Sequence, residues 1–211
     1  MYIQWYGQSC FKIQSGEKVI LIDPYSPRQA GLRGPNFKAA IVLLTNPFEA
    51  NLCKKNLKEE SFLINEAGEY EIKDIFIYGI TTKKKTANKI IEHTIYNIEV
   101  EGIKIGVLGA IDYIPAADEL EQLDGVHLLL IPVGGKEVLT PEKAADLIKQ
   151  IGSKIVVPSC YKIPGLKPSL LPIDNFLREI GRKKVEQIEK LSIHAKDLAE
   201  EEMKIVVLQT S

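Results

Sequence analysis

The chain has 211 residues, of which 45% are hydrophobic and 26% are charged, and its formal net charge is -1 at pH 7. This composition is typical of a globular protein with a buried core, and it excludes a disordered chain, a collagen-like repeat and a small disulfide scaffold. The even balance of charges gives no general attraction to nucleic acid or to anionic membranes, so neither is expected as a partner.

The first half of the sequence consists mainly of short β-type runs separated by turn residues. A helix is predicted at 48–57, an irregular loop rich in Pro and Gly at 25–35, and a two-residue hairpin turn at Glu101-Gly102. Strands are predicted at 2–6, 10–14, 19–22, 39–44, 62–65, 68–73, 75–80, 89–100 and 103–108.

Helices alternate with buried strands in the second half. Thr140 followed by Pro141 is typical of a helix start. No linker, low-complexity tract or repeat divides the chain, so residues 1–211 are expected to form one domain. The order of elements predicts an α+β layered sandwich, with two sheets stacked face to face and helices outside. The helices are predicted at 116–123, 141–151 and 170–180, and the strands at 126–131, 155–157 and 204–208.

The cysteines Cys10, Cys53 and Cys160 follow no CxxC spacing, which indicates reduced thiols in a cytoplasmic protein and not a disulfide framework. The first residues lack the basic and apolar segments of a signal peptide. The longest apolar runs are too short to span a bilayer. The sequence therefore predicts a cytoplasmic protein, and no apolar stripe predicts a particular oligomeric state.

Several segments in chain order resemble those of the metallo-β-lactamase fold. They include IQWYGQSCF at 3–11, LIDPY at 21–25, GEYEI at 68–72 and LIPVGG at 130–135. Shorter matches at 94–96, 156–158 and 191–208 extend the resemblance over nearly the whole chain. The branch that it resembles is that of the small metal-dependent hydrolases similar to ascorbate-6-phosphate lactonase. The resemblance implies a four-layer αββα sandwich.

The chemistry of that family depends on a T-H-x-H-x-D-H loop after a buried strand, whose side chains hold zinc-like ions that activate water. The corresponding loop here begins at Thr45 and reads TNPFEAN. Amides are poor zinc ligands, and phenylalanine and alanine are none. The resemblance therefore implies a degenerate, non-catalytic member that acts as a binding or scaffold protein without a cofactor. The former metal-ligand positions are Asn46, Phe48, Ala50, Asn51, Ala110 and Cys160.

An enzyme remains open as the alternative. Cys160, Asp112 and Glu49 are candidates for an altered thiol or metal site, and zinc would then be the cofactor of a hydrolase. The three histidines, His93, His127 and His194, are expected to be structural or solvated. The expected occupant of the cleft is a small molecule or a protein. The side chains expected to line a ligand-binding cleft are Gln8, Tyr25, Glu49, Asp112 and Tyr161.

A basic cluster at Lys83, Lys84, Lys85 and Lys89 is expected in a loop between two strands. A solvated hairpin tip is the simplest interpretation, and an anionic partner is the alternative. No aromatic residues alternate with these lysines, so binding of single-stranded nucleic acid is not indicated.

Overall fold

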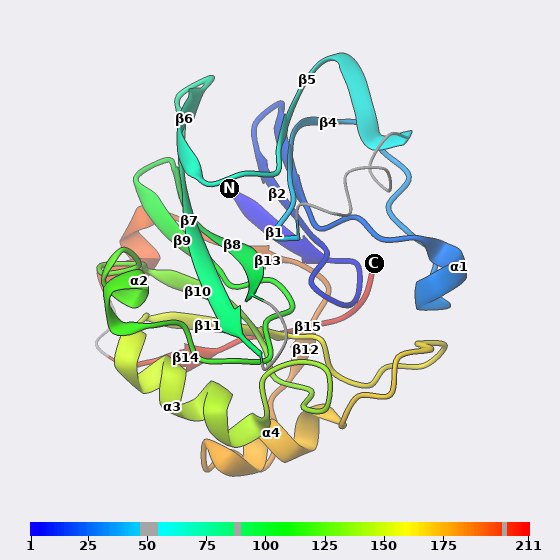
Figure 1. Cartoon of the computed structure of the whole chain (residues 1–211), viewed down its shortest axis with the longest axis vertical. Helices are drawn as coiled ribbons and strands as arrows, with labels where there is room; N and C mark the ends of the chain where they lie inside the picture. Colours follow the sequence, from blue (N-terminus) through cyan, green and yellow to red (C-terminus); the bar gives the residue numbers. More distant parts are fainter. Residues whose placement is uncertain (47–54, 87–89, 200–201) are drawn as a thin grey trace.

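Two mixed β-sheets, stacked face to face, form the body of the molecule (Figure 1). The computed structural model describes residues 1–46, 55–86, 90–199 and 202–211. The first sheet has six strands, and the last three of them run parallel. In spatial order they are β13 (Leu191–Ser192), β1 (Tyr2–Trp5), β2 (Phe11–Ser15), β3 (Lys18–Ile22), β4 (Ala39–Leu43) and β5 (Leu57–Ile64).

The second sheet has seven strands, parallel at one side and antiparallel at the other. In spatial order they are β14 (Lys204–Ile205), β11 (Ile155–Ser159), β10 (Leu128–Pro132), β9 (Ile103–Val107), β8 (Ile90–Val100), β7 (Ile75–Lys85) and β6 (Gly68–Ile72). A further parallel pair joins β12 (Gln187–Ile188) to β15 (Val207–Leu208).

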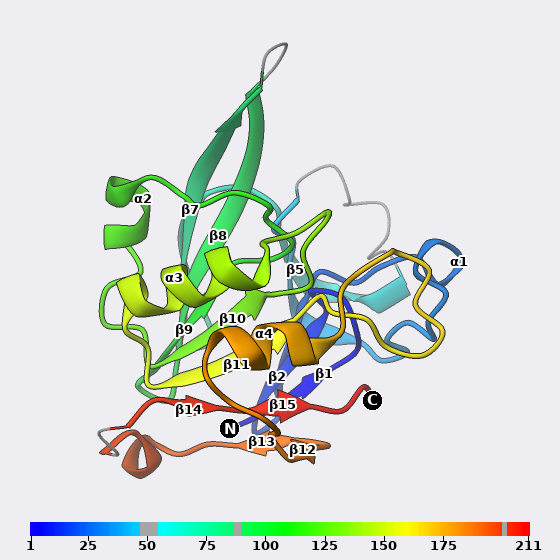
Figure 2. The same cartoon turned by 90° about the horizontal axis from the view of Figure 1, so that it is seen from below.

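The helices are short and lie outside the sheets. Figure 2 shows α3 (Pro141–Ile151) and α4 (Ile173–Glu179) alongside β10 and β11, on the outer side of the seven-stranded sheet. The remaining helical segments are α1 (Pro27–Ala30), α2 (Ala117–Glu121) and the 3-10 helix η2 (Ala195–Ala199). Among the described helices, none is long and apolar enough to cross a membrane.

The alternation of side chains along the strands creates the layers. In β3, Ile20 and Ile22 face the second sheet and belong to the main core, whereas Leu21 faces outward. Leu21 packs there in a smaller cluster with Val42 and with Ala30 of α1. The fold is therefore the predicted metallo-β-lactamase-like sandwich, and the segment around α1 covers the outer face of the six-stranded sheet.

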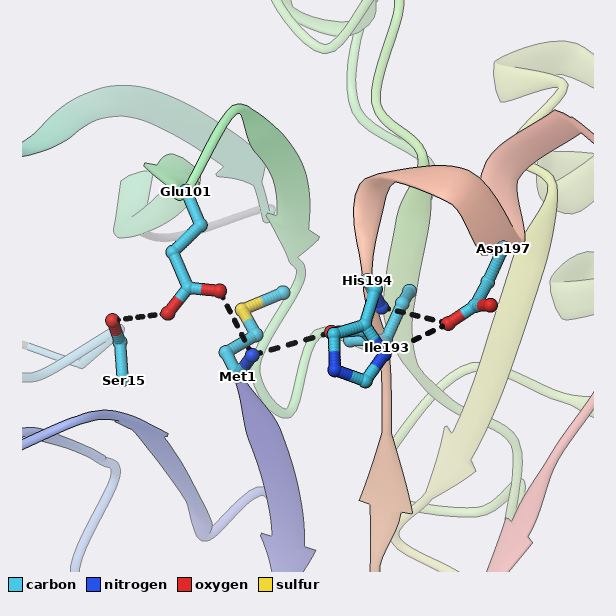
Figure 3. Close-up of polar contacts among 6 residues, drawn as sticks. All are labelled: Met1, Ser15, Glu101, Ile193, His194 and Asp197. Atoms are coloured by element: carbon cyan, nitrogen blue, oxygen red, sulfur yellow. Dashed lines mark hydrogen bonds and ion pairs between the residues drawn. The ribbon is translucent and has the colours of Figure 1, made fainter.

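The hairpin at Glu101-Gly102 is confirmed. Both residues have positive φ, 53° and 72°, as a two-residue turn between twisted strands requires. Glu101 also joins distant segments: it accepts hydrogen bonds from Ser15 at 2.5 Å and from the amino group of Met1 at 2.9 Å (Figure 3). That amino group also donates to the Ile193 carbonyl at 3.2 Å, so this end of the sandwich is tied together across both sheets.

Several sequence predictions need correction. Lys83, Lys84 and Lys85 do not form a loop but continue β7, because the ladder to β8 extends to the Lys85–Ile90 pair. The predicted loop 25–35 contains the single helical turn α1. Of the helix predicted at 48–57, residues 48–54 lie outside the described part of the chain, and Leu57 belongs to β5. The strands β12 and β13 were not predicted.

Candidate functional site

A cavity of about 320 Å³ opens where several strands end at one edge of the sandwich. We call it the polar cavity. Its walls come from the loops that follow β1, β3, β4 and β9, from α1 and β8, and from the segment before α4. Its lining residues are Gln8, Ser9, Asp23, Tyr25, Gln29, Thr45, Asn46, His93, Ala110 and Pro168.

Asp23 and Thr45 fix the floor of the polar cavity. The backbone N–H of Thr45 donates to Asp23 Oδ1 at 2.7 Å, and its hydroxyl donates to Asp23 Oδ2 at 2.7 Å. Both residues are buried. Both carboxylate oxygens are therefore occupied in joining the end of β3 to the end of β4, and the charge of Asp23 is stabilised by charge-assisted hydrogen bonds.

Three of the seven non-glycine residues with positive φ in the described part of the chain lie at the same edge. Gln8, Asp23 and Cys160 have φ values of 49°, 42° and 51°, in the left-handed region that costs energy for residues other than glycine. The N–H of Cys160 donates to the Gln8 carbonyl at 3.2 Å, so two of these residues hold each other in place. Strained residues gather at functional sites more than elsewhere, which identifies this edge as a candidate site.

His93 lines the polar cavity, a position that the sequence interpretation did not assign to it. Its Nε2 lies 3.0 Å from the Leu108 carbonyl, and since a carbonyl only accepts, Nε2 carries the proton and Nδ1 is left as an acceptor. Burial lowers the pKa of His93 to about 4, so the ring is neutral near pH 7. Because side chains alternate along a strand, His93 lies on the same face of β8 as the buried Ile95. This alternation could have indicated from the sequence that the His93 ring turns inward.

The structure brings together some of the predicted site residues. Gln8, Tyr25, Asn46 and Ala110 all line the polar cavity. The Tyr25 hydroxyl donates to the backbone carbonyl of Tyr6, which orients its ring at the rim. The predicted positions Phe48, Glu49, Ala50 and Asn51 lie outside the described residues.

Other predicted residues lie elsewhere. Tyr161 is not a cleft residue but a core residue: its ring centroid is 4.7 Å from that of Trp5, and its hydroxyl donates to the Leu208 carbonyl at 3.2 Å. Cys160 is buried beside the small apolar cluster of Val138, and burial raises the pKa of its thiol to about 12. A thiol with this pKa is protonated at neutral pH and is a poor nucleophile.

Asp112 belongs to a second depression, of about 620 Å³, which we call the outer groove. Its carboxylate forms an ion pair with Lys84, and both residues line this groove. The outer groove shares Asn46, His93 and Ala110 with the polar cavity, so the two adjoin along one wall.

Among the described residues of the site, the donor atoms do not converge on a zinc ion. Within the described part of the chain, no group of three or more His, Cys, Asp or Glu side chains is placed to hold a metal ion. His93 directs Nε2 to a backbone carbonyl, Asp23 binds Thr45 through both oxygens, and Cys160 is buried in a separate apolar cluster. Zinc sites need three or four converging nitrogen, sulfur or carboxylate ligands, and these residues do not supply them.

Known proteins match this chain over most of its length. A family model described as "Beta-lactamase superfamily domain" matches residues 2–159, well over half of the chain. A UPF0173 protein of Pyrococcus furiosus is 29% identical over 185 residues, which cover 76% of this chain and 83% of that protein. A UPF0173 protein of Pyrococcus abyssi is 25% identical over 207 residues, covering 88% and 93%.

Solved structures share the same fold. A Thermotoga maritima protein, described as a candidate Zn-dependent hydrolase of the metallo-β-lactamase superfamily, superposes with a TM-score of 0.79 at 26% identity. The superposition covers 98% of this chain and 97% of that one.

Proposed function

We propose that this chain, which belongs to the beta-lactamase superfamily, is a degenerate, non-catalytic member. We propose further that it binds a small neutral molecule in its polar cavity. The observation that carries this proposal is the chemistry of the cavity wall. Amide, hydroxyl and neutral imidazole groups line it in place of converging metal ligands. The resemblance assigns Asn46, Ala110 and Cys160 to ligand positions of the metal-binding family, and of these side chains the amide is a poor zinc ligand and the methyl group is none.

The lining also indicates the class of ligand. The amides of Gln8, Gln29 and Asn46 combine donors and acceptors, and the hydroxyl of Ser9 adds another polar group. No lysine or arginine is among the described residues of the cavity wall, and the carboxylate of Asp23 lies at its floor. The carboxylate of Asp23 therefore disfavours an anion in the cavity, whereas a neutral molecule with an amide-like edge would meet complementary groups.

The alternative, a hydrolase with an altered thiol or metal site, finds less support. Asp112 lines the outer groove in an ion pair with Lys84, while the Cys160 thiol is buried and protonated. The basic cluster also gives little support to an anionic partner, because Lys83 forms an ion pair with Glu92 at 3.3 Å. We further propose that residues 1–211 act as one domain in the cytoplasm, in keeping with the free, buried thiols of Cys10 and Cys160.

An isosteric pair of probes tests the proposal. Acetamide and acetate have the same shape but differ in charge, and NMR of the Ala110 methyl group and the His93 ring reports on occupation of the cavity. Acetamide should shift both signals saturably, and acetate should not. Asn46→Leu should weaken the acetamide response, whereas the matched change Asn65→Leu, outside the cavity wall, should not. A response to acetate alone, or equal responses in the two variants, would overturn the proposal.

A further inference from the structure

We infer that the outer groove binds an alkyl chain attached to the polar group in the polar cavity, so that the ligand is a neutral amphiphile with an amide-like head. This inference rests on the proposed function and extends it to the ligand class. Its first support is continuity: Asn46, His93 and Ala110 belong to the walls of both depressions. Ala110 is exposed, and its small side chain belongs to the walls of both depressions.

The outer groove combines apolar side chains with four charged ones, Lys84, Glu92, Asp112 and Glu137. Ile90, Ile91 and Ile111 line the outer groove, and Ile90 is 58% exposed, the highest exposure among the large exposed hydrophobic residues. An apolar group that covered the exposed part of Ile90 would remove its surface from water, which favours binding. A chain that starts in the polar cavity and continues past Ala110 would cover these side chains.

The charges of the groove are largely matched within the protein. Lys84 pairs with Asp112, and Glu92 pairs with Lys83 at 3.3 Å. These pairs leave little net charge to select a charged tail, although Glu137 also lines the groove and disfavours a negative one. With these ion pairs formed, the isoleucine side chains are the part of the wall that an uncharged alkyl chain would contact.

The wall of the groove is also held in place before any ligand binds. The hydroxyls of Thr82 and Tyr113 lie 2.6 Å apart, and the Lys84–Asp112 ion pair lies two residues further along β7. Both contacts join β7 to the segment that follows β9. A preformed wall requires little ordering on binding, which is typical of small-molecule sites.

A homologous series of primary amides tests the inference. Acetamide, butanamide, hexanamide and octanamide are titrated into the intact chain, with the Ala110 and His93 signals as the readout. Each methylene that enters the groove should raise affinity by about fourfold, as the transfer of a CH₂ group from water predicts. Equal affinities along the series would overturn this inference and leave the proposed function intact. Failure of every amide, acetamide included, would overturn both.

Two matched variants locate the alkyl chain. Ile90→Ser should reduce octanamide affinity by roughly fivefold and leave acetamide affinity unchanged. Ile114→Ser is the control, since Ile114 is also exposed, at 39%, but is not among the groove residues. Both side chains are exposed, so neither variant is expected to disturb folding. If the two variants bind octanamide equally, the chain does not occupy the groove and the inference is wrong.

Discussion

Gly109 lies where the loop after β9 meets the floor of the polar cavity. A Cβ atom at this position would lie 2.2 Å from Thr45 Oγ1 and 2.8 Å from His93 Nε2. Its φ of +66° is in addition a conformation that side chains disfavour. Packing and backbone geometry therefore both require glycine here, and the position of His93 depends on it.

A pair of glycine substitutions separates these two requirements. Gly125 has a similar φ of +71°, but no atom of another part of the chain would lie within 4 Å of a Cβ added there. Gly125→Ala should cost about 1 kcal/mol in free energy of unfolding, from backbone strain alone. Gly109→Ala should cost at least about 2 kcal/mol more, because Thr45 and His93 must move. Chemical denaturation measures both values, and equal losses would contradict the packing argument.

The depressed pKa of His93 makes the stability of the protein depend on pH. Between about pH 6.5 and 4 the unfolded chain binds a proton at this residue that the folded chain does not. The contribution is thus fully present above pH 6.5 and is lost as the pH falls toward 4, by roughly 3 kcal/mol in total. His93→Gln should remove this part of the pH dependence, whereas exposed His194→Gln should not. Denaturation at a series of pH values would refute the assignment if both variants kept the wild-type slope.

At the scale of elements, apolar patterning predicted most strands because their burial is regular. The run of β10 is buried throughout, as its continuous apolar sequence indicates. The end of β7 could not be predicted in this way, because residues 81–85 contain no apolar side chain. Backbone pairing with β8 and the burial of Thr82, whose hydroxyl contacts Tyr113, keep that segment extended. The two-residue strands β12 and β13 are too short to show a period.

The N-cap hydrogen bond of α3 can be tested by substitution. Thr140 Oγ1 accepts a hydrogen bond from the N–H of Lys143 at 3.3 Å, as its place before Pro141 predicts. Thr140→Ala should lower the free energy of unfolding by about 1 kcal/mol, since one N–H at the helix start loses its partner. Thr140→Ser keeps the hydroxyl and should restore most of the loss. A similar loss in both variants would show that packing of the methyl group, and not capping, is what matters.

At the scale of the whole molecule, several residues that line the site could be predicted, but the direction in which each side chain points could not. Gln8, Tyr25, Asn46 and Ala110 follow strand ends, and strand ends that meet at one edge bring their loops together. Tyr161 also follows a strand, but its ring turns inward to Trp5. Linear sequence does not encode which way such a side chain turns, because long-range packing decides it.

Restoring the family's ligands tests whether only those side chains have changed. A combined variant with histidine at four positions and aspartate at two should bind zinc if the surrounding loops still hold the required geometry. Isothermal titration measures the affinity, and circular dichroism checks that the variant is folded. A folded variant that takes up no zinc would show that the supporting hydrogen bonds have been lost as well. The substitutions are Asn46→His, Phe48→His, Asn51→His, Cys160→His, Ala50→Asp and Ala110→Asp.

The metal content of the native protein tests the central claim most directly. Protein purified without chelator or affinity metal is analysed by elemental mass spectrometry, with its fold checked on the same sample. We expect zinc, iron and manganese each to stay below roughly a tenth of an equivalent per chain, because the described donors do not converge on a metal. A folded protein carrying about one equivalent of any of these metals would contradict the account and identify the site as a metal centre.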